Sequence, residues 1–106
     1  ELNKVYEYIF KNFKNQINLE DVAALIPMNL SAFSRFFSKV HKKSFTRYLN
    51  EIRIGYACKM LMEKYYPINI ICFESGFNSL SNFNKQFKII TGKTPSEYAN
   101  YHSSKS

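Results

Sequence analysis

The chain has 106 residues, enough for one ordinary domain or for two very small subdomains that share a core. Hydrophobic residues make up 45% of it and aromatic residues 17%, which argues against intrinsic disorder, and three Gly with three Pro are too few for a turn-rich all-β fold. The formal net charge of +7 favours a polyanionic partner, either nucleic acid or an anionic membrane surface, with a basic surface that has no such role as the simple alternative.

The spacing of apolar residues predicts seven helices, of which three precede residue 41. The first covers roughly residues 3–15. The second begins after a cap at Asn18 and ends near Pro27, and the third, over residues 30–40, begins after a cap at Asn29. The third helix carries apolar residues at helical spacing that we expect to face the core, namely Leu30, Phe33, Phe37 and Val40.

A long fourth helix is predicted over residues 44–64. Its apolar residues cover most of its circumference, which is typical of a helix buried on several sides, as a strut between two subdomains would be. At about 1.5 Å per residue such a helix spans roughly 30 Å, close to the roughly 34 Å between successive major grooves on one face of DNA.

Three shorter helices follow. The fifth covers residues 69–75, and the glycine after it ends the helix because that position commonly needs a positive φ. The sixth, over residues 80–91, is capped by Asn78 or Ser79 and ends at Gly92. The seventh has a strong start signal, with Thr as the cap, Pro at the first helical position and Glu at the third, in Thr94-Pro95-Ser96-Glu97.

The chain repeats itself at an offset of 50 residues, which aligns residues 30–48 with residues 80–98. Six pairs are identical: Leu30/Leu80, Ser31/Ser81, Phe33/Phe83, Phe37/Phe87, Lys43/Lys93 and Tyr48/Tyr98. Upstream the offset is 49, so we expect one additional residue in the second turn. Each copy contains a short helix, a turn and a second helix, which is the order of a helix-turn-helix motif. Two simple helical hairpins would bury the same Phe residues, so the outer faces must distinguish the two interpretations.

The outer faces of the third and sixth helices carry short polar side chains and cations. No Asp or Glu occurs between Asp21 and Glu51 or between Glu74 and Glu97, whereas a merely solvated helix face usually mixes both signs of charge. Such a face suits the edges of bases in a groove of DNA. The candidate base contacts are Ser31, Ser34, Arg35, Ser81, Asn82, Asn84 and Lys85.

A second set of residues lies beside these faces and next to helix ends. Backbone N–H groups at helix starts assist the binding of phosphate, and two matching clusters of Lys flank the two faces. The candidate phosphate contacts are Lys39, Lys42, Lys43, Ser79, Lys88, Lys93 and Thr94.

From about Val5 to Tyr101 the chain resembles the DNA-binding domain of AraC/XylS-type bacterial transcription regulators. The segments that carry the resemblance are "LEDVAALIPMNLSAFSRFF", "YLNEIRIGYACKML" and, most specifically, "GFNSLSNFNKQFKIITGKTPSEY". Two positions concern the family pattern in particular. Lys42 stands where a glycine usually follows the third helix, so this helix end must differ or tolerate strain, and Arg53 matches a basic position that we expect to be structural.

The resemblance implies an all-α fold in which residues 1–106 form a single DNA-binding domain. We expect a first helix-turn-helix subdomain over residues 1–43, a linker helix over 44–64 and a second subdomain over 65–106, with the third and sixth helices in adjacent major grooves of double-stranded DNA. The resemblance also implies a bacterial, cytoplasmic protein that meets RNA polymerase in its full-length form, with a sensing or dimerisation domain that precedes this chain.

Other functions fit the sequence less well. An enzyme is not expected, because the chain has no paired carboxylates on one face, no Gly-rich phosphate loop and no cluster of metal ligands, so neither a cofactor nor a metal is predicted. His41 and His102 lie far apart and are expected at the surface, and Cys58 and Cys72 are expected to be reduced core residues. No membrane partner is expected, because the outer faces are polar. The alternative function is a basic helical module that binds a protein without specific DNA readout.

Overall fold

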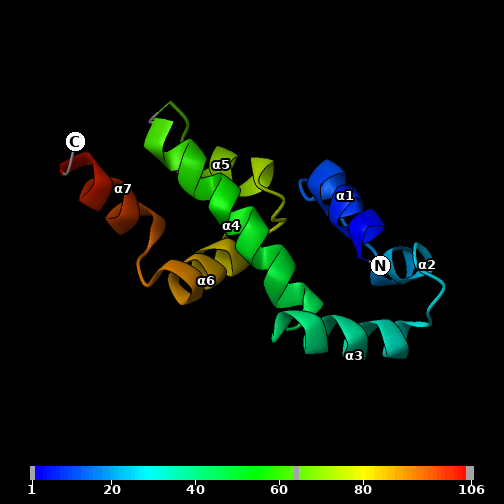
Figure 1. Cartoon of the computed structure of the whole chain (residues 1–106). Coiled ribbons are helices and arrows are strands. Elements are labelled where there is room, and N and C mark those ends of the chain that lie inside the picture. The colour runs from blue at the N-terminus through cyan, green and yellow to red at the C-terminus, as the bar shows by residue number, and fades with distance from the viewer. Residues whose placement is uncertain (1, 64, 105–106) are drawn as a thin grey trace. The chain divides into compact units, whose positions relative to one another are not determined.

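The computed structural model describes residues 2–63 and 65–104, and these residues form seven α-helices and no strand (Figure 1). The prediction of an all-α fold is therefore confirmed. The helices are α1 (Asn3–Asn12), α2 (Leu19–Ala24), α3 (Leu30–His41), α4 (Phe45–Glu63), α5 (Ile68–Glu74), α6 (Leu80–Thr91) and α7 (Pro95–Ser104).

The chain divides into two compact units, Glu1–Leu49 and Asn50–Ser106. The boundary falls inside α4, which lies within the predicted linker segment. The finer division into residues 1–43, 44–64 and 65–106 stays a prediction.

The core of the first unit is built from α1, α2, α3 and the start of α4. Phe33 and Phe37 of α3 are completely buried, and their rings lie 5.7 Å apart. Phe45 and Tyr48 of α4 pack edge-on against Phe37, at 5.3 and 5.1 Å between ring centroids. The aliphatic part of this core comes from α1 and α2, through the completely buried residues Val5, Ile9 and Val22.

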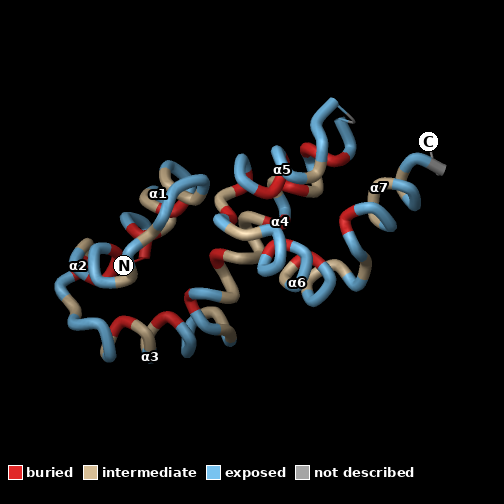
Figure 2. Tube along the Cα trace, turned by 180° about the vertical axis from the view of Figure 1, so that it is seen from behind, coloured by how far each residue is buried: buried red, intermediate tan, exposed pale blue. Residues whose placement is uncertain are grey.

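The second unit repeats this construction with α5 and α6. Phe83 and Phe87 of α6 are completely buried 5.7 Å apart, and Tyr98 of α7 packs edge-on against Phe87 at 5.5 Å. Ile71 of α5 corresponds to Val22 of the first unit, and both are buried. Figure 2 shows buried and exposed positions alternating along α3 and α6. The repeat seen in the sequence is therefore a repeat of packing.

The apolar stripes are not buried along their whole length. Leu30 is 39% exposed, Val40 49% and Leu80 40%, so the expectation that the whole stripe of the third helix faces the core is wrong at its ends. The partner helices are too short to cover those ends, because α2 has 6 residues against the 12 of α3. At about 1.5 Å per residue, these lengths are roughly 9 and 18 Å.

Several helix boundaries differ from the prediction by one to three residues; α2, for example, ends at Ala24 and not near Pro27. α1 ends at Asn12 instead of residue 15, and there the Asn12 side chain donates to the Tyr8 carbonyl at 2.9 Å while the Asn15 N–H donates to the Asn12 carbonyl. The polar residues 14–16 offer no apolar side chain that would keep the helix on the core. α5 begins one residue early, at Ile68, after an extended Pro67.

The predicted caps are confirmed. The Asn18 side chain accepts a hydrogen bond from the Glu20 N–H at the start of α2. The Asn29 side chain accepts from the Ala32 N–H at 2.8 Å, and the Ser79 hydroxyl accepts from the Asn82 N–H at 3.0 Å, which decides between the two alternatives for α6. These bonds satisfy N–H groups that have no partner within the helix.

The turn between α5 and α6 begins with a glycine-dependent helix stop. Gly76 has a φ of 105°, its N–H donates to the Phe73 carbonyl, and the Phe77 N–H donates to the Cys72 carbonyl. This pair of bonds is the Schellman motif. The Ser75 hydroxyl, completely buried, donates to the Ile71 carbonyl at 2.7 Å, so this polar side chain is satisfied inside the core.

The additional residue of the second repeat lies in a helix. The connections cover residues 25–29 and 75–79 and are equal in length, whereas α5 has 7 residues and α2 has 6. The expectation of a longer second turn is therefore wrong: the Schellman motif ends α5 one residue later in the repeat than α2 ends, and the turn keeps the same length.

Candidate nucleic-acid interface

The outward face of α3 carries its three predicted base contacts. Ser31 and Arg35 are exposed and Ser34 is half-buried. Phe33 and Phe37, which alternate with them, are completely buried. The helical period thus places two hydroxyls and one guanidinium on the surface opposite the core of the first unit.

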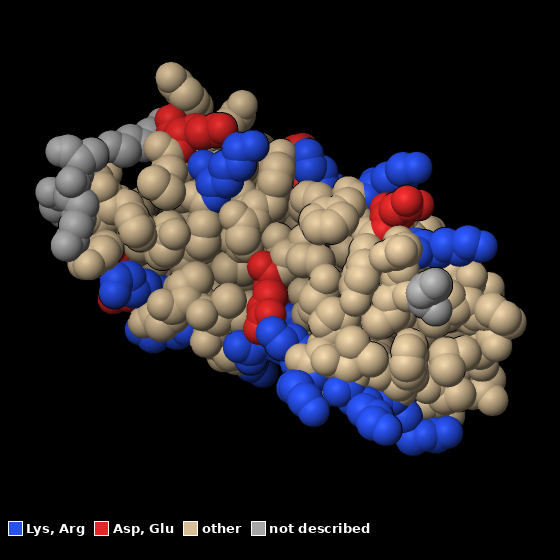
Figure 3. Space-filling model, in the orientation of Figure 1, with Lys and Arg blue, Asp and Glu red and all other residues tan. Residues whose placement is uncertain are grey.

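Cations extend this face toward the C-terminal end of α3. Lys39 and Lys42 are exposed and Lys43 is half-buried. Figure 3 shows Lys and Arg side chains gathered over α3, along the lower edge of the view. Cations at a helix C-terminus interact favourably with the helix dipole, so the helix itself stabilises part of this basic cluster.

Lys42 ends α3 in a backbone conformation that usually requires glycine. Its φ is 61° and its ψ is 24°, and its N–H donates to the Ser38 carbonyl at 2.8 Å. Gly92 ends α6 in the same way, with a φ of 82° and a 2.8 Å bond to the Lys88 carbonyl. Lys42 therefore departs from the family pattern in residue type only. Its backbone tolerates the strain of a positive φ, and α3 ends in the same conformation as α6.

The outward face of α6 carries four predicted base contacts, all of them exposed: Ser81, Asn82, Asn84 and Lys85. The side-chain oxygen of Asn82 accepts a hydrogen bond from Gln86 Nε2 at 3.3 Å. An amide oxygen accepts two hydrogen bonds and the amide nitrogen donates two, so Asn82 keeps a free acceptor site and its donors for a base edge.

The predicted phosphate contacts of the second motif already have partners within the protein. Lys88 Nζ lies 3.7 Å from Glu97 Oε1, and Lys93 Nζ lies 4.7 Å from the centre of the Tyr101 ring. Ser79 serves as the cap of α6. A phosphate would have to compete with these contacts or share the side chains with them.

Thr94 and Glu97 form a reciprocal capping box at the start of α7. The Thr94 N–H donates to Glu97 Oε1 at 2.9 Å, and the Glu97 N–H donates to the Thr94 hydroxyl at 3.1 Å. The Thr94 N–H, and secondarily the charge of Lys88, hold the pKa of the Glu97 carboxyl below its usual value. The carboxylate therefore stays ionised at neutral pH.

One residue of the first motif belongs with the candidates but was missed. The exposed Ser44 hydroxyl accepts from the Arg47 N–H at 3.1 Å at the start of α4, as Thr94 does at the start of α7. The 50-residue offset pairs Ser44 with Thr94, so the repeat contained the signal that identifies it.

His41 is not simply a surface residue, contrary to the expectation. It is half-buried, its ring stacks on Phe37 at 4.3 Å, and its Nε2 is 2.8 Å from the Tyr6 hydroxyl. Because His41 lies at the end of the buried face of α3, aromatic side chains of α1 and α4 pack against its ring. It acts there as a structural member of the aromatic cluster.

The two cysteines are free thiols. Cys72 is buried and Cys58 is half-buried, and burial raises the pKa of both, so they stay protonated at neutral pH. Their expected place in the core is thus correct for Cys72 and only partly correct for Cys58.

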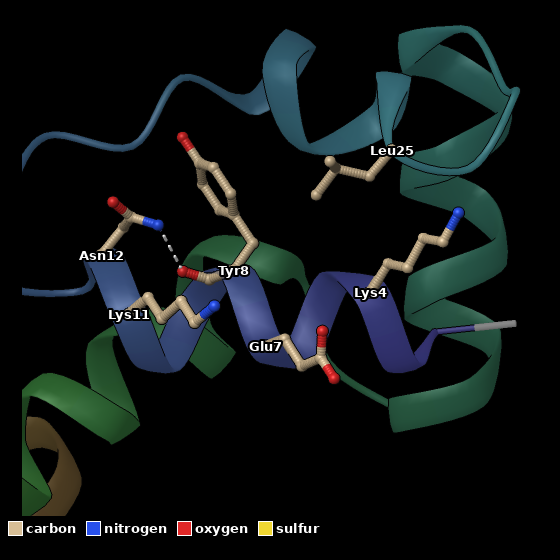
Figure 4. Close-up of a pocket in the computed structure, with 6 residues that line it drawn as sticks. All are labelled: Lys4, Glu7, Tyr8, Lys11, Asn12 and Leu25. Carbon is tan, nitrogen blue, oxygen red and sulfur yellow. Dashed lines mark hydrogen bonds between the residues drawn. The ribbon is translucent and has the colours of Figure 1, made fainter.

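An open pocket of about 340 Å³ lies on the first unit. Five of the six residues that line it come from α1, and Leu25 follows the end of α2. Figure 4 shows Leu25 reaching toward α1 between Tyr8 and Lys4. None of the candidate DNA contacts lines this pocket.

Two equivalent helix-turn-helix motifs, each with a polar and basic outward helix, define a DNA-binding domain of the transcription-regulator class. A family model described as a helix-turn-helix domain matches residues 22–101. The chain belongs to this family, in its AraC-type form. Within the described residues, no helix is both long and apolar enough to cross a membrane.

Known proteins with similar sequences or structures agree with this assignment. An uncharacterised HTH-type transcriptional regulator of Staphylococcus aureus is 30% identical over 92% of this chain, which spans only 13% of that relative. The C-terminal domain of AraT, a response regulator from Geobacillus stearothermophilus, is 27% identical with a TM-score of 0.86, covering 94% of this chain and 84% of that one. The DNA-binding domain of AdpA, solved with a target DNA, shares the fold with a TM-score of 0.89 at 21% identity, covering 98% and 94%.

Proposed function

We propose that this domain reads a specific DNA sequence with α3 and α6 as recognition helices, placed in adjacent major grooves, and thereby regulates transcription. The observation that carries the proposal is the pair of exposed faces that hold donors and cations without a carboxylate. Each face projects from a helix held by an equivalent cap and an equivalent buried Phe pair.

Bases are read differently by the two helices in this proposal. Arg35 offers a planar fork that bonds guanine O6 and N7 together, whereas Lys85 at the matching position offers a single flexible charge. Asn82 and Asn84 have the donor and acceptor that adenine N7 and N6 require. The first motif therefore reads its half-site more strictly than the second.

Phosphates are held by the residues beside these faces. In the first motif they are Lys39, Lys42 and Lys43, and in the second they are Ser79, Lys88, Lys93 and Thr94. These contacts fix the orientation of the protein on the duplex and carry no sequence information themselves.

Selection from a randomised duplex library, followed by nuclease footprinting of the selected DNA, tests the proposal. We expect two protected half-sites centred about 10 bp apart on one face of the duplex. Protection confined to one groove would contradict the two-motif model. Binding without any sequence preference would instead favour a basic module that recognises a protein.

The complete protein is proposed to contain more than this domain. The chain spans 13% of the Staphylococcus aureus relative and 39% of the regulator YobQ of Bacillus subtilis. We propose that a sensing or dimerisation domain accompanies it and that RNA polymerase is a partner of the full-length regulator. A two-hybrid assay between the full-length protein and the polymerase subunits tests the second point.

A further inference from the structure

Lys88 and Glu97 form an ion pair on the surface of the second unit. The distance from Lys88 Nζ to Glu97 Oε1 is 3.7 Å, and the two side chains are 56% and 59% exposed. Both are therefore accessible to a DNA backbone that approaches α6.

The carboxylate in this pair is fixed in place. Glu97 Oε1 accepts from the Thr94 N–H at 2.9 Å, and the Glu97 N–H returns a bond to the Thr94 hydroxyl. An isolated exposed ion pair must order two long side chains, which removes most of its benefit. Here the capping box has already ordered one of them, so the pair with Lys88 costs less conformational entropy.

The first motif cannot form this pair at the equivalent positions. The 50-residue offset places Ser38 opposite Lys88 and Arg47 opposite Glu97. The position that holds a carboxylate in the second motif therefore holds a cation in the first. The capping bond is nevertheless the same, because the hydroxyls of Ser44 and Thr94 each accept a backbone N–H at 3.1 Å. The helix cap alone does not require Glu97 to be acidic, because Arg47 occupies the same place.

We propose that Glu97 is an internal competitor for DNA phosphate at Lys88. In the free domain the carboxylate holds the Lys88 ammonium, and on binding the ammonium moves to a phosphate while Glu97 stays in its capping box. Glu97 is then a positioning residue that weakens phosphate binding by the second motif. This inference rests on the proposed function, since it requires that α6 meets DNA.

The exchange has an electrostatic signature. Binding of Lys88 to a phosphate releases one condensed counterion, but it also leaves Glu97 without its partner, and that carboxylate then attracts a cation from solution. The two effects oppose each other, so Lys88 contributes less to the salt dependence of binding than an unpaired lysine. Removing the charge of Glu97 restores the full contribution.

Glu97→Gln tests the proposal, because Gln keeps the oxygen that accepts the Thr94 N–H and loses the charge. The probe is a fluorescent duplex of about 30 bp of mixed sequence, titrated at salt concentrations between about 50 and 200 mM. We expect the variant to bind two- to fivefold more tightly at the lowest salt, on the order of an exposed ion pair, and log K to fall more steeply with log[salt] by up to about one unit of slope.

Two controls separate this role from a general effect of charge. Glu74→Gln removes an exposed carboxylate of α5 and changes the net charge equally. Glu97→Gln in a Lys88→Gln background should gain no more affinity than this control, because the competition has no lysine to act on. Thermal unfolding of Glu97→Gln should remain a single cooperative transition, which establishes that the variant is folded under the conditions of the titration.

An equal gain in both backgrounds, or no gain from Glu97→Gln at all, would overturn the competition. Failure of the unmodified domain to bind the duplex at any salt concentration would instead contradict the proposed function. The two failures are therefore distinguishable in one set of titrations.

Discussion

Lys42 and Gly92 occupy the same backbone conformation at the ends of two equivalent helices, with φ angles of 61° and 82°. An L side chain is disfavoured in this region, because its Cβ comes close to the backbone. The first motif therefore carries a strain that the second avoids. It gains in return a cation at the border of the α3 face.

Lys42→Gly should raise the free energy of unfolding by about 1 kcal/mol, because glycine adopts positive φ without this strain. Gly92→Ala should lower it by a similar amount, and only through backbone strain, since the added Cβ meets no atom within 4 Å apart from those of its own residue and its chain neighbours. Urea titration of both variants measures these changes. No change in the free energy of unfolding from either exchange would mean that these two positions are unstrained.

Arg35→Ala should cost about 1–3 kcal/mol of DNA binding and relax the preference at one or two base pairs. Lys85→Ala should weaken binding with a smaller loss of discrimination, because a flexible ammonium is less exacting about its acceptor. Measuring the affinity of each protein variant for single-base variants of the selected DNA site gives the loss of binding and the loss of discrimination. Equal loss of discrimination in the two variants would refute the asymmetry between the motifs.

Sequence patterns identified these surface residues but not their partners. The periodicity placed Arg35, Asn84 and Lys85 on exposed faces, where the structure has them. The pair of Lys88 with Glu97 was missed, because it depends on how the cap of α7 orients a carboxylate toward α6. Such an orientation follows from tertiary packing and has no periodic signal.

At the scale of the helices, stability should depend on equivalent Phe residues in α3 and α6. Phe33→Ala and Phe83→Ala should each lower the free energy of unfolding by about 3–5 kcal/mol, because both rings are completely buried. Leu30→Ala and Leu80→Ala are matched controls one turn away, and their partial exposure predicts a much smaller loss. Thermal or urea unfolding of the four variants measures these losses of stability. A small effect of either Phe variant would contradict its assignment to the core.

The capping box of α7 should depend on pH. Because the pKa of Glu97 is lower in the folded chain than in the unfolded chain, its contribution to stability is fully present above the ordinary pKa of Glu. That contribution is lost as the pH falls through the lowered value. NMR titration of the Glu97 side chain should show this low midpoint, and amide exchange in α7 should accelerate in the same range. Glu97→Gln serves as the control, since its amide does not titrate.

Helix starts were predicted more accurately than the extent of burial. Asn29 and Thr94 were recognised as caps because capping is local chemistry between residues two or three positions apart. The exposure of Leu30 and Val40 was not predicted, because it depends on the length of the neighbouring helix. The end of α1 at Asn12 was missed for a related reason: apolar spacing continues to Phe13, but the polar residues 14–16 offer no apolar side chain that would extend the helix along the core.

At the scale of the whole molecule, DNA binding should be dominated by charge. If about six to eight phosphates are contacted, log K should fall against log[salt] with a slope of about −5 to −7. The formal net charge of +7 and the carboxylate-free faces are the physical reason. Fluorescence titration at several salt concentrations measures the slope. A slope near zero would exclude the proposed binding mode.

α3 and α6 have the same length of 12 residues, and each begins with a side-chain bond to the third N–H and ends with a 2.8 Å bond from a left-handed residue. Their buried Phe residues occupy the same places in each helix. The exposed residues of one are thus interchangeable with those of the other without disturbing a cap or a core contact. Moving the exposed side chains of α3 into α6 should therefore create a domain that prefers the same base pairs in both half-sites.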